Sequence, residues 1–125
     1  HPHKHRRGLA RLRYAFVYSL QGLLAGVRTS PAFRLELALA GFGFVLAFLL
    51  GRNWLEVVFL LAVLVLVLIV EMLNCGIEAA IDRVGFEIHP LSKLAKDYGS
   101  AAVFLSLVLC AGVWLSLLCV RLVAY

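Results

Sequence analysis

The chain has 125 residues, of which 63% are hydrophobic and 15% are charged, with 12 Lys and Arg against 7 Asp and Glu. A soluble domain of this size cannot hide so much apolar surface, and the hydrophobic content also excludes a disordered chain. Cys75, Cys110 and Cys119 lie within apolar sequence, which excludes a disulfide scaffold and predicts buried thiols. We therefore expect a membrane protein with one domain, residues 1–125.

Residues 1–8 form a basic tail whose histidines indicate either a solvated segment or an adventitious metal site. In residues 9–29 the apolar side chains recur with helical period on one side: Leu9, Leu12, Phe16, Leu20, Leu23 and Val27. This pattern predicts an amphipathic helix lying on the membrane surface. Pro31 favours an extended Ser30 and so ends that helix. Gly22 and Gly26 are spaced for close helix contact.

Three further stretches are long and apolar enough to cross a hydrocarbon core of about 30 Å. They cover residues 33–52, residues 54–84, which include a cytoplasmic extension, and residues 90–122. Buried helices of a soluble protein are the alternative, but the chain offers only one other helix to cover them. The predicted fold is an all-α membrane protein with an N-terminal amphipathic surface helix and three transmembrane helices.

Basic residues predict the orientation of these helices. Most of them precede the first apolar stretch or separate the second from the third: Lys4, Arg6, Arg7, Arg11, Arg13, Arg28, Arg34, Arg83, Lys93 and Lys96. Only Arg52 and Arg121 fall on the other side. Because cytoplasmic loops carry the excess of Lys and Arg, we expect a cytoplasmic N-terminus.

The second apolar stretch runs into acidic residues without a helix breaker. Its polar side chains fall within one narrow stripe of the helix: Glu71, Asn74, Glu78 and Asp82. We expect Glu71, Asn74 and Glu78 to converge on a volume one metal ion wide. Oxygen ligands suit Mg²⁺, which takes one or two carboxylates together with phosphate oxygens. A proton site and ordinary solvated acids at a helix end are the alternatives.

Gly85 is expected to end this long helix and Pro90 to begin the next. Lys96 and Asp97 then lie close to the membrane surface, able to face the acidic stripe across a tight turn. A lysine there neutralises phosphate charge or, alternatively, anchors the topology. The sequence has no glycine-rich phosphate loop, so any nucleotide is held by metal, lysine and acids.

The run EMLNCGIEAAIDRVG, followed by FEIHPLSKLAKDYGSAAV, resembles the signature of the small prokaryotic diacylglycerol kinase and undecaprenol kinase family. The resemblance covers the second span through the third, and the order of helices fits the whole chain. It implies a homotrimer in the bacterial cytoplasmic (inner) membrane, with active sites between neighbouring subunits at the cytoplasmic surface. Such proteins phosphorylate a lipid hydroxyl with ATP and Mg²⁺.

The resemblance also implies roles for individual residues. Glu71 would be the general base, Asn74 would orient groups beside it, and Glu78 would hold Mg²⁺. The implied nucleotide contacts are Arg11, Tyr18, Glu78, Glu87, His89, Lys96 and Asp97. The implied lipid contacts are Ala32, Phe33, Arg34, Glu36 and Ser100.

The chain departs from the family pattern at two places. Ser30 stands where the family usually has a glutamate that serves as a second metal ligand, and Glu36 is a poorly placed substitute. Cys75 and Gly76 replace a Ser or Thr and an Ala, which is expected to widen a helix contact. The first departure indicates altered metal use, a different lipid-phosphate chemistry or an impaired family member.

The expected activity is phosphorylation of diacylglycerol to phosphatidic acid, with undecaprenol as the alternative acceptor. From another class, a non-catalytic membrane subunit or a small transporter would conduct ions along the acidic stripe. That function requires polar groups at mid-span, where the chain offers little beyond Gly41, Gly43, Ser106 and cysteines.

Overall fold

The computed structural model describes residues 8–85 and 89–123. These residues form four helices and no strand: α1 (Leu9–Thr29), α2 (Pro31–Leu50), α3 (Trp54–Val84) and α4 (Pro90–Val123). Helices α2, α3 and α4 are long and apolar enough to cross a membrane. The all-α fold with three apolar helices is therefore confirmed.

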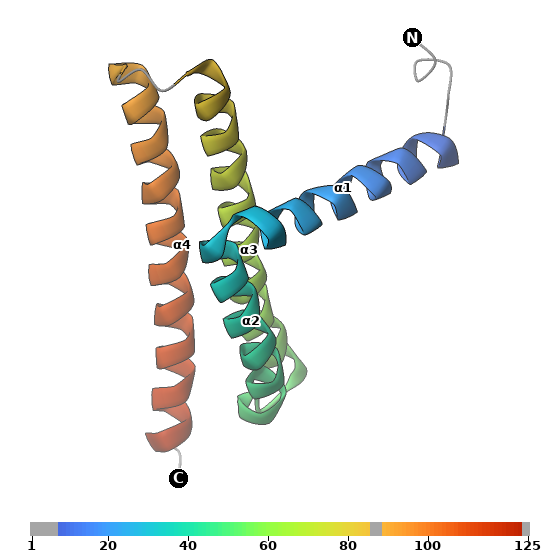
Figure 1. Cartoon of the computed structure of the whole chain (residues 1–125). Coiled ribbons are helices and arrows are strands. Elements are labelled where there is room, and N and C mark those ends of the chain that lie inside the picture. Colours follow the sequence, from blue (N-terminus) through green and yellow to red (C-terminus); the bar gives the residue numbers. More distant parts are fainter. Residues whose placement is uncertain (1–7, 86–88, 124–125) are drawn as a thin grey trace.

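Helix α3 is the central element, because it packs against both α2 and α4. Figure 1 shows that α1 projects sideways from its junction with α2, while α3 and α4 continue past that junction. The end of α3 and the start of α4 thus extend beyond the level of the α1–α2 junction. This arrangement leaves a corner between the α1–α2 junction and the upper part of α3.

The junction between α1 and α2 consists of one extended residue, Ser30, with φ −113° and ψ 108°. The Ser30 hydroxyl accepts a hydrogen bond from the backbone N–H of Phe33 at 3.1 Å, and Pro31 occupies the first helical position. The Arg34 guanidinium donates to two carbonyl oxygens in the last turn of α1, at 2.8 and 3.2 Å. Both helix ends are therefore capped, and α2 begins at Pro31 rather than at the expected residue 33.

One face of α3 carries the core of the bundle. Its buried apolar residues recur every three or four positions: Val57, Leu60, Val63 and Val67. The next buried residues along the same face are Glu71 and Asn74. Apolar packing against α2 and α4 thus sets the rotation of the helix, and that rotation turns these two polar side chains inward.

Gly26 gives α1 its close contact with the bundle. A Cβ at this position would collide with the Met72 side chain on α3 and would crowd the buried Phe33 ring. A Cβ at Gly22 would meet no described atom within 4 Å, so only one of the two glycines serves a helix contact. A Cβ at Gly76 would likewise meet no described atom within 4 Å. Gly76 is exposed, so the expectation of a wider helix contact at this residue is wrong.

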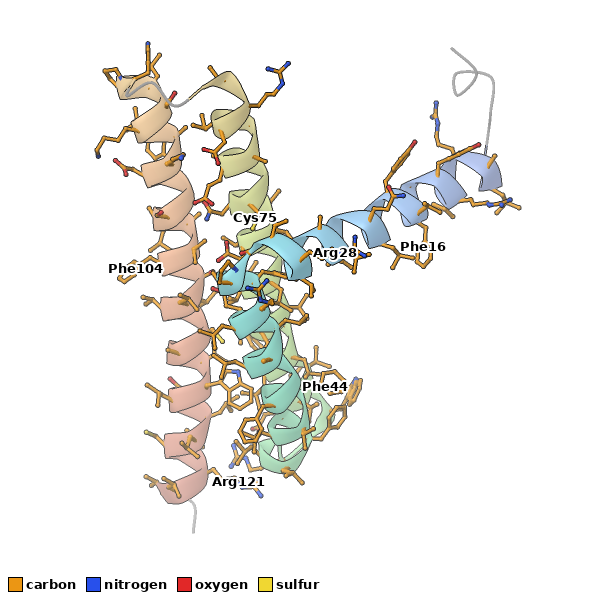
Figure 2. The ribbon with its side chains drawn as sticks, viewed as in Figure 1. Phe16, Arg28, Phe44, Cys75, Phe104 and Arg121 are labelled. Carbon is orange, nitrogen blue, oxygen red and sulfur yellow. The ribbon has the colours of Figure 1, made fainter. Side chains whose placement is uncertain are left out.

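The expectation of buried thiols is wrong for this chain. Cys75 and Cys110 are half-buried and Cys119 is exposed. The reason is that much of the apolar surface of these helices faces outward, as Phe104 does in Figure 2, where it projects from α4 with 64% of its surface exposed. In a membrane protein such apolar surface contacts lipid or another subunit rather than an interior.

Polar contacts also close the end of the bundle opposite the start of α4. Arg121, labelled near the end of α4 in Figure 2, donates to the Leu50 carbonyl oxygen at 2.6 Å. Arg52 and Glu56 form an ion pair at 2.9 Å where α3 begins. These contacts tie α4 to the α2–α3 hairpin, far from the corner at α1.

Candidate active site

The corner between the α1–α2 junction and α3 contains a groove of about 390 Å³. Figure 2 shows Cys75 on α3 beside the end of α1 that carries Arg28. The groove is lined by Thr29, Ser30, Pro31, Ala32, Glu71, Asn74, Cys75, Glu78, Ala79 and Asp82. The structure therefore brings the whole acidic stripe of α3 together with Ser30.

Glu71 is the most deeply buried acid of the groove, with 4% of its surface exposed. The Asn74 amide nitrogen donates to Glu71 Oε2 at 3.3 Å, and the Cys75 thiol lies 3.8 Å from the same oxygen. A buried carboxylate requires such donors, because its transfer out of water is otherwise very costly. The carboxyl group of Glu71 is consequently held in one orientation at the bottom of the groove.

Asn74 is held from the other side by α4. Its Oδ1 atom is buried, has no hydrogen-bond partner among the described residues, and lies against Gly99. A side chain at Gly99 would occupy the space of that oxygen. Sequence reasoning missed this role of Gly99, although the residue belongs to the motif that carries the resemblance.

Glu36 on α2 faces Glu71 across the helix contact. Its Oε2 atom is buried without a hydrogen-bond partner in the described part of the chain. Two carboxylates this close repel each other unless they share a proton or a cation. Glu36 is not among the residues that line the groove with Glu78.

Lys96 on α4 reaches α3 at the open end of the groove. Its ammonium lies 3.1 Å from Asp82 Oδ1, and the side chains are 44% and 58% exposed. Asp97 instead pairs with Lys93 at 2.7 Å on the outer side of α4 and does not line the groove. Of the two expected nucleotide contacts in this turn, only Lys96 thus faces the acidic stripe.

Several other expected nucleotide contacts do not reach the groove of their own chain. Arg11 and Tyr18 lie exposed on α1, which projects away from the bundle in Figure 1. His89 is exposed, and its Nδ1 atom accepts a hydrogen bond from the Leu91 backbone N–H at 3.1 Å. Glu87 and the histidines of the basic tail lie outside the described residues.

The expected lipid contacts occupy different environments. Ala32 lines the groove, and Ser100 is exposed on α4. Phe33 is 1% exposed and belongs to the core, while the Arg34 guanidinium is engaged with the end of α1. Phe33 and Arg34 therefore support the α1–α2 junction.

The convergence of Glu71, Asn74 and Glu78 on one metal ion stays a prediction. Among the described residues no group of three or more His, Cys, Asp and Glu side chains is close enough to hold a metal. The reason is the axial rise of a helix, which separates Glu71 from Glu78 by about 10 Å. Glu78 has an exposed carboxylate in the groove. A single carboxylate suits Mg²⁺, because this ion takes few protein ligands together with phosphate oxygens.

Three apolar helices, a projecting amphipathic helix and an acidic groove at one end define a small integral membrane protein. A sequence model described as prokaryotic diacylglycerol kinase matches residues 17–118. The chain belongs to the prokaryotic diacylglycerol kinase family, as its motifs predict.

Several curated relatives match nearly the whole chain. A diacylglycerol kinase of Pseudomonas aeruginosa is 46% identical over 117 residues, which cover 94% of this chain and 95% of the relative. A diacylglycerol kinase of Haemophilus influenzae is 41% identical over 107 residues, covering 86% of this chain and 91% of the relative. That of Escherichia coli K12 is 40% identical over 111 residues, with coverages of 89% and 91%.

Proposed function

We propose that this protein is a lipid kinase that transfers the γ-phosphate of ATP to the hydroxyl of diacylglycerol and so forms phosphatidic acid. The observation that carries the proposal is the buried Glu71–Asn74 pair in a groove where α1 joins the bundle. Family membership and the names of the relatives support diacylglycerol as the acceptor over undecaprenol. They also favour this activity over a divergent lipid-phosphate chemistry.

Glu71 acts as the general base in this proposal. Its carboxylate takes the proton of the lipid hydroxyl while the hydroxyl oxygen attacks the γ-phosphorus. A new oxygen–phosphorus bond forms, the bond from the γ-phosphorus to the bridging β–γ oxygen breaks, and ADP leaves. Asn74 and Cys75 hold the carboxyl group, and such positioning supplies much of the catalysis in phosphoryl transfer.

Glu78 and Lys96 offset the negative charge of the phosphates in this proposal. Glu78 would hold Mg²⁺, which when bound neutralises charge on the β- and γ-phosphates. The Lys96 ammonium, at the open end of the same groove, attracts the phosphates directly. With Ser30 in place of the usual glutamate, the protein offers this metal one carboxylate fewer.

We further infer a homotrimer whose active sites lie between neighbouring subunits. The support is that α1, on which Arg11 and Tyr18 are exposed, projects away from the groove of its own chain. In a trimer these side chains would reach the groove of a neighbouring subunit. His89, Asp97 and the undescribed Glu87 complete the nucleotide contacts in this arrangement. The excess of basic residues near α1 and the α3–α4 loop supports a cytoplasmic N-terminus in the bacterial inner membrane.

The ionic pathway of a transporter has little support. Ser106, the buried polar residue within α4, donates to the Val103 carbonyl oxygen of its own helix at 2.7 Å. Trp114 likewise donates to the Leu60 carbonyl oxygen at 3.3 Å. These groups are satisfied within the bundle, so they do not extend the acidic groove through the membrane.

Phosphate transfer from labelled ATP by the purified protein in detergent tests the function. The lipids are diacylglycerol, undecaprenol and a glycerol ether that lacks a free hydroxyl, each with and without Mg²⁺. We expect Mg²⁺-dependent labelling of diacylglycerol, weak labelling of undecaprenol and none of the ether. Absence of labelled lipid with both Mg²⁺ and Mn²⁺ would contradict the proposal.

A further inference from the structure

Asp82 lines the groove, but the family resemblance implies no role for it. It lies one helical turn beyond Glu78 on the same face of α3. Its Oδ1 atom accepts a hydrogen bond from Lys96, which is 14 residues further along the chain on α4. The contact thus joins the end of one long helix to the start of the next.

Lys96 needs a partner to stay at the groove. A lysine ammonium sits on a flexible stem of four carbons and is strongly hydrated, so an unpaired lysine at this exposed site would extend into water. The neighbouring acid on α4 does not compete for it, because Asp97 is paired with Lys93 at 2.7 Å. Asp82 therefore determines that the Lys96 ammonium points toward α3.

The ion pair of Asp82 and Lys96 lies at the exposed end of the groove. Glu71, Glu78 and Asp82 follow one another along the wall of the groove, from its buried end to its exposed end. An ammonium at Asp82 is thus next in line after the carboxylate proposed to hold Mg²⁺. A nucleotide that enters from the exposed end would meet the ammonium of this ion pair.

We propose that Asp82 is a positioning residue that holds Lys96 at the mouth of the groove for the phosphates of ATP. The inference rests on the proposed kinase function. Asp82 acts through Lys96 and does not contact the reacting atoms. In the alternative, Asp82 would compete with the phosphates for the ammonium. Its removal would then lower the KM for MgATP.

Steady-state kinetics of Asp82→Asn and Asp82→Glu, with lipid and MgATP varied separately, distinguish these cases. Because an exposed ion pair contributes little, we expect Asp82→Asn to raise the KM for MgATP by about fivefold. The KM for diacylglycerol should stay within about twofold, and Asp82→Glu should recover most of the loss. Asp82→Ser gives the same expected rise and replaces Asp82→Asn if that variant does not assemble.

A double-mutant cycle separates positioning from a structural effect. In a Lys96→Met background, Asp82→Asn should add no further increase in KM, because the group that it positions is gone. Glu56→Gln is the matched control, since it also removes the acid of an ion pair on α3, at the opposite end of the bundle. It should leave both KM values unchanged.

The remaining outcomes of these kinetic tests contradict either the role of Asp82 or the kinase function. An unchanged or lower KM for MgATP in Asp82→Asn, or an additive effect in the Lys96→Met background, refutes the positioning role while wild-type activity upholds the kinase. A wild-type protein that phosphorylates no lipid refutes the proposed function itself. A loss confined to the KM for diacylglycerol refutes the link between Asp82 and the nucleotide.

Discussion

The Asn74 amide donates to the Glu71 carboxylate at 3.3 Å, one helical turn away on the same buried face of α3. The two side chains are 9% and 4% exposed, so the hydrogen bond lies in a largely dry environment. Gly99 of α4 closes the other side of Asn74. The orientation of the proposed base thus depends on two helices at once.

Glu71→Gln should abolish turnover without disturbing the fold. The amide keeps the shape and the buried position of Glu71 but cannot accept the proton, and loss of a general base costs roughly 10²- to 10⁴-fold in rate. The kcat of the detergent-purified variant should fall accordingly, while its binding of MgATP and its elution on size exclusion stay close to wild type. A kcat near that of wild type would remove Glu71 from the base role.

Gly99→Ala should reduce both stability and rate. The added methyl group meets the buried Asn74 oxygen, and overpacking of this kind costs about 1–3 kcal/mol. We expect a lower thermal midpoint and a kcat reduced by about tenfold because the Asn74–Glu71 hydrogen bond is displaced. Gly112→Ala on the same helix is the control, since a Cβ there meets no described atom within 4 Å.

Glu78→Gln should weaken the use of Mg²⁺. A neutral amide oxygen is a poorer ligand for a hard cation, so we expect the Mg²⁺ concentration for half-maximal rate to rise about tenfold or more. The rate at saturating lipid and ATP is measured against Mg²⁺ for wild type and variant. An identical Mg²⁺ dependence would show that Glu78 does not hold the metal.

Ser30 stands where the resemblance leads us to expect a metal-binding glutamate, and Ser30→Glu tests whether a carboxylate at this position binds the metal. Wild type should need high Mg²⁺ or favour Mn²⁺, and the variant should use Mg²⁺ at lower concentration and turn over faster. Ser30 also caps α2 through the Phe33 N–H, and loss of such a cap costs about 1 kcal/mol.

Two companion variants separate these effects. Ser30→Asp keeps a capping oxygen while adding a carboxylate, and Ser30→Ala removes the cap alone. Tighter Mg²⁺ use should appear in Ser30→Glu and Ser30→Asp but not in Ser30→Ala. If neither acidic variant changes the metal dependence, the position does not contribute to metal binding in this chain.

Sequence by itself determined the local features of this protein. Hydropathy predicts three spanning helices, and helix boundaries follow from Gly85 and Pro90, which end α3 and begin α4. Gly85 has a φ of 143°, which suits glycine. Helical period likewise places the acids from Glu71 to Asp82 on one stripe, since the period depends only on the backbone of a single helix. The motifs of that stripe also identify the family.

Only the tertiary structure decided which of these groups meet. The pairing of Asp82 with Lys96, the facing of Glu36 and Glu71, and the contact of Gly99 with Asn74 depend on how separate helices rotate and slide against one another. That register is set by the packing of apolar residues far from the groove, which periodicity along one helix does not encode. A helical-wheel projection also discards the rise of the helix, so it does not show that Glu71, Asn74 and Glu78 lie at successive levels along α3.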